Sequence, residues 1–318
     1  MEPLSILDRP HVEARALLAS GAPVHLFVNP VEYHGPHLSL HNDRLVSEGL
    51  ARALHQRIGE KNGWPFLVAP DLELGVEPTR GAGSRHAPFE VARAAVREAC
   101  RAIAELGAQR VILHTFHGAP LHNLAIQAGV ELLREARVRA LAPFNGVLRE
   151  LLEVGSARDT GARYADALSH IEDPVERAEM LRDLHLDFHA GFFETSMALH
   201  LAPSSVSGSH VALPPCPPIT PHVLAANASK IARVVGRDVL ASELTFAAFG
   251  LGWQQLDPFP GYTGRPHRAT AASGAIFTRH ILEGYERLVD EVLLGDGRSP
   301  DPIMAWVAAL TAGGRLTP

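Results

Sequence analysis

The chain has little of what marks secreted, membrane-embedded or nucleic-acid-binding proteins. Only two of its 318 residues are cysteines, Cys100 and Cys216, which excludes a disulfide-stabilised scaffold and favours a reducing compartment. No uncharged apolar run reaches the roughly 18 residues of a membrane-spanning helix, and the N-terminus lacks the basic and apolar segments of a signal peptide. With a net charge of −6 and no basic stripe, nucleic acid is excluded as a partner. We expect a cytoplasmic protein without a membrane partner.

Two common functional motifs are also missing. The chain has no Gly-x-Ser-x-Gly elbow, so a serine hydrolase of that type is not expected. Residues 81–86 begin like a dinucleotide-binding fingerprint, but His86 stands at the position of the third glycine. The segment also does not open the first strand-to-helix turn, and we therefore discount nucleotide binding.

The composition is that of a globular protein, with 46% hydrophobic and 20% charged residues. At 318 residues the chain can bury a sizeable core, and it contains neither a repeat nor a low-complexity linker. We therefore expect one domain over residues 1–318.

The first half of the chain alternates between short apolar runs and helical patterns. Strands are predicted at 24–28, 65–70 and 110–115, and helices at 44–58, 89–106 and 121–136. In the helix at 44–58, Leu45, Gly49, Ala53 and Ile58 form the expected buried stripe. Gly107 is expected to end the helix at 89–106. Strands separated by helices of this length indicate parallel βαβ units and an α/β fold.

The second half is expected to be mostly helical. Residues 145–188 have a charged helical pattern. Further helices are predicted at 194–201, 222–250 and 274–294, and long loops at 203–221 and 257–266.

The richest chemistry follows the first predicted strand. Glu32 and His34 are two residues apart, so in extended backbone their side chains leave on the same face. Asp43 comes nine residues later, after a Gly35-Pro36 step that can fold the chain back. Carboxylate and imidazole ligands suit divalent ions such as Zn or Mn. The alternative is a surface loop whose imidazoles bond to backbone carbonyls.

Two later segments carry matching residues. His117 follows the strand at 110–115, where it would reach the same cleft, whereas His114 is as easily a core histidine. His189 and Glu194 flank a glycine turn and could supply a general base and a further metal ligand. Glu194 could also simply complement a helix dipole.

With these segments in hand, the sequence resembles the creatininase (creatinine amidohydrolase) family. The family segment Glu-x-His-Gly-x-His-Leu-Pro-Leu-x-x-Asp corresponds to residues 32–43. Its His-Ala-Gly-x-x-Glu-Thr-Ser segment corresponds to residues 189–196, and a Gly- and Pro-containing segment near the C-terminus corresponds to residues 261–274. The matches keep their order and extend from about residue 22 to 290.

The resemblance implies a three-layer α/β/α sandwich with a mostly parallel sheet, and a hexameric homo-oligomer. It also implies two divalent ions, Zn, Mn or Fe, bridged by Asp43. Glu32 and His117 would hold one ion, and His34 and Glu194 the other. His189 would act as a proton shuttle, and with Glu194 it forms the expected catalytic pair.

The chain departs from the family at residues 115–120, which read Thr-Phe-His-Gly-Ala-Pro where the family has Asn-Gly-His-Gly-Gly-Asn. Ala119 stands where creatininase itself has a metal-binding glutamate. The resemblance therefore moves that role to Glu194 and argues against creatinine as the substrate.

These observations favour a metal-dependent hydrolase of a small cyclic or linear amide. The alternatives are hydrolytic ring opening of a cyclic ketone or polyol, trimming of a peptide terminus, and a metal-binding scaffold without catalysis. The candidate substrate-binding residues are His37, Ser84, His86 and Arg265.

Overall fold

A parallel sheet lies at the centre of the fold. The computed structural model describes residues 2–151 and 163–316, and in them five strands pair in the order β1-β3-β2-β4-β5, each pair parallel. The strands are β1 (Leu4–Ser5), β2 (Val24–Phe27), β3 (Leu67–Val68), β4 (Arg110–His114) and β5 (Arg139–Leu141). All four residues of β2 are buried, as expected for a central strand covered on both faces.

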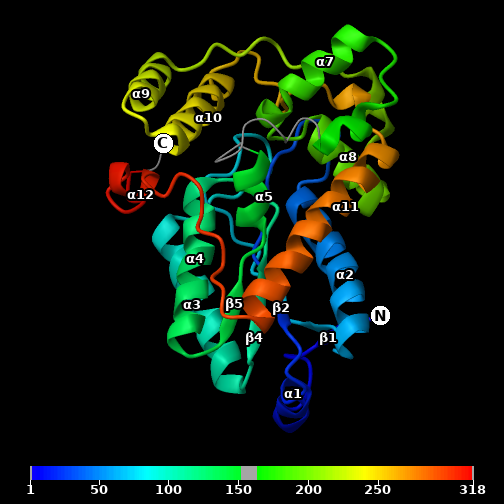
Figure 1. The fold of residues 1–318 in the computed structure, drawn as a ribbon, viewed down its shortest axis with the longest axis vertical. Coiled ribbons are helices and arrows are strands. Elements are labelled where there is room, and N and C mark those ends of the chain that lie inside the picture. Colours follow the sequence, from blue (N-terminus) through cyan, green and yellow to red (C-terminus); the bar gives the residue numbers. More distant parts are fainter. Residues whose placement is uncertain (1, 152–162, 317–318) are drawn as a thin grey trace.

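Helices cover both faces of this sheet. They are α2 (Asn42–Asn62), α3 (Phe89–Leu106), α4 (Pro120–Glu135), α8 (Phe192–Leu201) and α11 (Ala271–Leu288). Helix α3 packs on α4, while α11 packs on α2 and α8. Figure 1 shows α3 and α4 on one side of the sheet and α2 and α11 on the other. The predicted three-layer α/β/α sandwich is confirmed.

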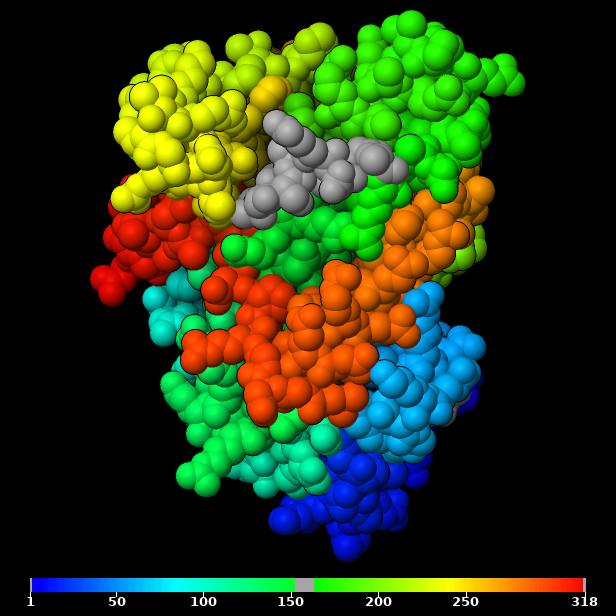
Figure 2. Space-filling view, in the orientation of Figure 1, coloured from blue at the N-terminus to red at the C-terminus, as the bar shows by residue number. Residues whose placement is uncertain are grey.

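The remaining helices surround this sandwich. They are α1 (His11–Leu18), α5 (Phe144–Leu151), α7 (Pro174–Arg182), α9 (Val223–Val234), α10 (Asp238–Gln254) and α12 (Val307–Leu310). Helices α9 and α10 pair and form a lobe beside α12, yellow next to red in Figure 2. The Glu243 carboxylate on α10 ties this lobe to the C-terminal segment, because it accepts the N–H of Met304 and the indole N–H of Trp306.

No helix in the described part of the chain has the length and apolarity needed to cross a bilayer. Both cysteines are free, Cys100 buried and Cys216 half-buried.

Several predicted elements were wrong in their bounds. The helix expected at 222–250 is broken between α9 and α10 at Gly236, whose φ of 72° is incompatible with a continuing helix. The loop at 203–221 contains the short 3₁₀ helices Pro203–Ser205 and Gly208–Ala212. Part of the segment predicted at 145–188 lies outside the described residues. Strand β1, helix α1 and strand β5 were not predicted.

Helix ends were predicted better than buried faces. Gly107 ends α3 in the left-handed region, with φ 114°, as predicted. In α2, however, the fully buried stripe is Val46, Leu50, Leu54 and Ile58. Its first three residues each come one position after a residue of the predicted stripe, and Ile58 belongs to both stripes. Leu45, Gly49 and Ala53 of the predicted stripe are only half-buried.

Three buried imidazoles connect the central strands to α2. His55 Nε2 lies 3.1 Å from the Trp64 carbonyl, which can only accept, so this nitrogen carries the proton. His55 Nδ1 therefore accepts from His25 Nε2 at 3.2 Å, and His25 Nδ1 accepts from His114 Nε2 at 2.9 Å. His25 and His55 satisfy both ring nitrogens in this way only when they are neutral.

Acid is therefore expected to destabilise the fold through this imidazole chain. Burial lowers the pKa of His114 to about 3, whereas an unfolded histidine titrates near pH 6.5. The stability contribution is complete above pH 6.5 and is lost as the pH falls towards the folded pKa, because the unfolded state then binds more protons. Between pH 6.5 and 5, the free energy of unfolding should fall less steeply with decreasing pH in His114→Gln than in the wild type. The two slopes should differ by up to about 1.4 kcal/mol per pH unit.

Urea denaturation at each pH measures this slope. The control is His11→Gln, which alters an exposed histidine on α1 and should keep the wild-type slope. Equal slopes in His114→Gln and the wild type would contradict the neutral chain.

Candidate metal centre

The loop between β2 and α2 brings two of the predicted ligands together. The Glu32 N–H donates to the Leu40 carbonyl at 2.9 Å, which closes the loop. Gly35 turns it with a φ of 66°, a conformation that glycine adopts without strain. The His34 Nδ1–H donates to the Glu32 carbonyl at 3.1 Å. His34 Nε2 is thereby left as a ligand nitrogen, 3.8 Å from Glu32 Oε2.

Asp43 lies between two imidazoles. It is buried in the first turn of α2, where the helix dipole favours a carboxylate. Its Oδ1 is 3.1 Å from His34 Nε2, and its Oδ2 is 3.6 Å from His117 Nδ1. Each carboxylate oxygen thus faces a different histidine.

His117 reaches the same point from β4. Strand β4 pairs with β2, with His114 beside Phe27, so the segments that follow both strands emerge at one sheet edge. The His117 Nε2–H donates to the Val76 carbonyl at 3.0 Å, and Nδ1 lies 2.8 Å from Glu32 Oε2.

Glu194 comes from the first turn of α8. Its Oε2 accepts the Ala190 N–H at 2.6 Å and lies 3.7 Å from His34 Nε2. The turn before α8 is tight: Ala190 has a φ of 47°, and a Cβ on Gly191 would lie 2.2 Å from the Asp187 carboxylate. The glycine at this position therefore lets Asp187 accept the first N–H groups of α8.

His189 lies directly against these ligands. Its ring stacks on that of His34 at 4.4 Å between centroids, and Trp253 packs against it at 5.1 Å. The His189 Nε2–H donates to the Tyr33 carbonyl at 2.9 Å, so Nδ1 is the ring nitrogen left to accept a proton.

Three groups of side chains in this cluster could each hold a metal ion. They are Glu32–Asp43–His117, His34–Asp43–Glu194 and Glu32–His34–His189, and within each group the ligand atoms lie within 4.8 Å of one another. Asp43 belongs to the first two, which is the sharing expected of a carboxylate that bridges two ions.

The unpaired atoms of the cluster fit cations. Glu32 Oε2, His34 Nε2 and both Asp43 carboxylate oxygens are buried without a hydrogen-bond partner. Buried polar atoms in native proteins are normally satisfied, by metal coordination among other means. The donor set of carboxylates and imidazoles suits Zn, Mn or Fe.

The electrostatics point the same way. Burial raises the pKa of Asp43, and it raises that of Glu194 to about 8. Burial opposes the charge of His34, yet the facing Asp43 carboxylate raises its pKa to about 10. The carboxylates therefore draw positive charge into the cluster, which is the role a divalent cation fills.

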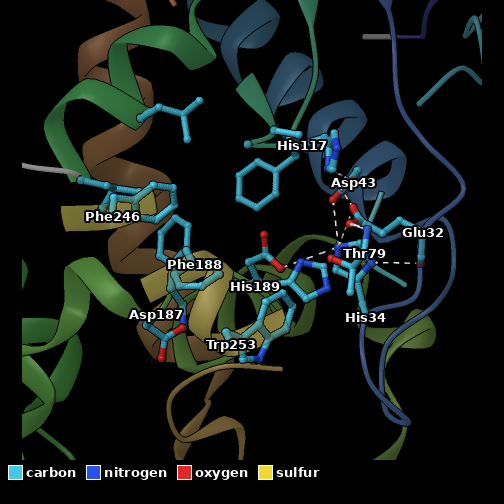
Figure 3. A pocket seen from close by; sticks show the side chains of 18 of the residues that line it. Glu32, His34, Asp43, Thr79, His117, Asp187, Phe188, His189, Phe246 and Trp253 are labelled. Atoms are coloured by element: carbon cyan, nitrogen blue, oxygen red, sulfur yellow. Dashed lines mark hydrogen bonds and ion pairs between the residues drawn. The ribbon is translucent and has the colours of Figure 1, made fainter. Parts of the chain in front are cut away.

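A cavity of about 230 Å³ opens beside the cluster. Glu32, His34, Asp43, His117, His189 and Glu194 all line it. Figure 3 shows the metal-ligand cluster on one side of the cavity and Phe188 and Phe246 on the opposite side. The fold thus brings these six residues, all named as candidates from the sequence, to one cavity.

The four candidate substrate-binding residues do not line this cavity. The His37 Nε2–H donates to Thr195 Oγ1 at 2.8 Å, which makes it part of the packing of α8. The Ser84 hydroxyl ties two loops by accepting the Tyr33 N–H. His86 is exposed, and Arg265 pairs with Glu176 and Glu179 of α7 at 3.2 and 2.7 Å.

The apolar lining of the cavity was not predicted. It includes Leu148 of α5, Phe246 and Trp253 of α10, and Phe188, which precedes His189. Phe116 and Phe193 also line it, each next to a predicted ligand in the sequence. Their position beside predicted ligands was the one sequence signal for this apolar lining. The residues that α10 contributes to the cavity could not be found in this way, because their placement depends on long-range packing.

The geometry predicts how many ions each variant binds. Wild-type protein reconstituted with Zn or Mn should hold about two equivalents. Asp43→Ala should hold almost none, because both groups lose a ligand. Glu194→Ala should keep about one equivalent, at Glu32, Asp43 and His117.

Elemental analysis after gel filtration measures these equivalents. Glu48→Ala, an exposed carboxylate on the same helix as Asp43, serves as the control and should keep the wild-type content. Full metal content in Asp43→Ala would contradict the shared-ligand arrangement.

Comparison with known proteins identifies the family. The family model for creatininase, described as creatinine amidohydrolase, matches residues 7–289. A creatinine amidohydrolase of Pseudomonas putida is 27% identical over 206 residues, which cover 61% of this chain and 70% of the relative.

Solved creatininase structures share the fold. A mutant creatininase of the Zn-Zn type has a TM-score of 0.58 at 20% identity, covering 92% of this chain and 98% of its own. A structure described as creatininase Mn has a TM-score of 0.54 at 19% identity, covering 91% and 98%. The chain belongs to the creatininase family and has its α/β fold.

Proposed function

We propose that this protein is a metal-dependent hydrolase that cleaves the C–N bond of a small amide. The observation that carries the proposal is the pair of buried ligand groups that share Asp43, with its unpaired carboxylate oxygens. Glu32 and His117 would hold one divalent ion, and His34 and Glu194 the other. Zn and Mn, which the related creatininases carry in their descriptions, both suit these donors.

When bound, such ions supply a water whose pKa is lowered towards neutrality and a Lewis acid for the amide oxygen. The protein holds the ligands in place through their outer nitrogens. His34 and His117 donate their remote N–H groups to the carbonyls of Glu32 and Val76, which fixes both rings in the ligating tautomer.

Glu194 takes the metal-binding role that a glutamate has in creatininase at the position of Ala119. Ala119 lines the cavity but has no atom that could bind an ion. Glu194 lies 3.7 Å from His34 Nε2 and is anchored by the Ala190 N–H. Its position supports a ligand role at the second ion.

His189 is the proposed proton carrier. Burial is the main cause that lowers the pKa of His189, which favours the neutral ring. Nδ1 can then accept a proton from the attacking water and deliver it to the leaving nitrogen. The C–O bond forms as the C–N bond breaks, and the products are a carboxylic acid and an amine.

The test compares metal content with turnover. Metal-loaded protein should hydrolyse at least one member of a panel of small amides, lactams and cyclic ketones. His189→Ala should keep its metal and lose at least about 100-fold in kcat, because it lacks the proton carrier. His200→Ala, an exposed histidine on α8, should behave like the wild type.

Each alternative has its own outcome in this test. Wild-type kcat in His189→Ala would overturn the proton-carrier role. Turnover of ketones alone would indicate ring opening of a cyclic ketone as the reaction. Bound metal without turnover of any member would indicate a metal-binding scaffold.

A further inference from the structure

The cavity beside the metal centre is strongly asymmetric. Its polar end consists of the metal ligands and His189. Away from them the lining is largely aromatic and aliphatic, and Figure 3 shows Phe188 and Phe246 across the cavity from Glu32, His34 and Asp43. A substrate that places its amide at the polar end must fit its substituent against this apolar end.

The aromatic lining begins next to the reacting groups. Phe116 precedes His117, Phe188 precedes His189, and Phe193 precedes Glu194, and all three phenylalanines line the cavity. The same short backbone segments therefore position a polar ligand and an apolar wall. The substituent that meets this wall is the one attached directly to the amide.

Two aromatic clusters make up most of the wall. In the first, Phe188 packs edge-on against Phe246 at 5.0 Å and against Trp253 at 5.5 Å. In the second, Phe116 packs on Phe144 at 5.1 Å and on Phe193 at 6.0 Å. Rings that are held by one another offer a preorganised surface for a further flat apolar group.

The charges of the cavity exclude an acidic substituent. Among the described residues that line it there is no lysine or arginine. Glu77 and Asp187 add acidic groups beyond the proposed ligands, and Arg265, the nearest predicted anion binder, is paired with α7. A carboxylate on the substituent would be desolvated there without a lysine or arginine as partner.

We propose that the substrate is an uncharged amide whose substituent is a flat aromatic or similarly apolar group. This inference rests on the proposed metal-dependent function, since the metal centre holds the amide. Within small amides, the inference selects those whose substituent can pack against the phenylalanine and tryptophan rings of the cavity.

Hydroxamates test the inference because they bind metal centres through one common group. Isothermal titration of the metal-loaded protein should show benzohydroxamic acid binding at least about tenfold more tightly than acetohydroxamic acid. The para-carboxylate derivative of benzohydroxamic acid should lose most of this gain, because no lysine or arginine lines the cavity to meet its charge.

Variants locate the effect. Phe246→Ala should reduce the preference for the phenyl compound to less than about threefold, and Phe188→Ala, on a different segment, should do the same. Both side chains are only half-buried, so the core remains packed. Phe249→Ala is the matched control, because Phe249 also lies on α10 but lines a second cavity, and it should keep the wild-type preference.

The outcomes separate this inference from the function on which it rests. Equal binding of the phenyl and methyl compounds, or a preference unchanged in both Phe246→Ala and Phe188→Ala, overturns the aromatic substrate class and leaves the metal-dependent function standing. Failure of all hydroxamates to bind metal-loaded protein overturns the proposed function and the inference together.

Discussion

The burial of three carboxylates at one point is the constraint on which the site depends. Glu32, Asp43 and Glu194 are at most 6% exposed, and like charges repel strongly where water is excluded. His34 and His117 face these carboxylates, and protonating them is one way to supply positive charge. The proposed divalent cations would meet the same need, and they would also coordinate the unpaired lone pairs with the imidazoles as neutral ligands.

The fold meets this constraint by placing each ligand just beyond the end of a regular element. Glu32 and His34 follow β2, and His117 follows the neighbouring strand β4. Asp43 and Glu194 lie in the first turns of α2 and α8, where helix dipoles favour negative charge. Ends of adjacent parallel strands and helix N-termini meet at one edge of the sheet, so the ligands need little loop structure to converge.

The aromatic lining and the metal centre support each other. Phe116 and Phe193, next to His117 and Glu194, are buried and add apolar surface to the cavity. Electrostatic interactions are stronger near apolar surface, which would favour the proposed metal binding and the proposed polarisation of an amide. Trp253 packs against His189, whose N–H is bound by the Tyr33 carbonyl, so the proposed proton carrier has a fixed orientation.

Local sequence patterns were enough to predict the α/β fold and to name six polar side chains that meet at one cavity. The α/β alternation predicted the sheet, and the spacing of Glu32, His34 and Asp43 predicted a cluster, because short-range backbone geometry sets which side chains share a face. Tertiary structure decided the rest. It paired Arg265 with Glu179 of α7, left His86 at the surface, and broke the predicted helix at Gly236. It also brought α10 to the cavity, since packing between distant segments is not encoded in local spacing.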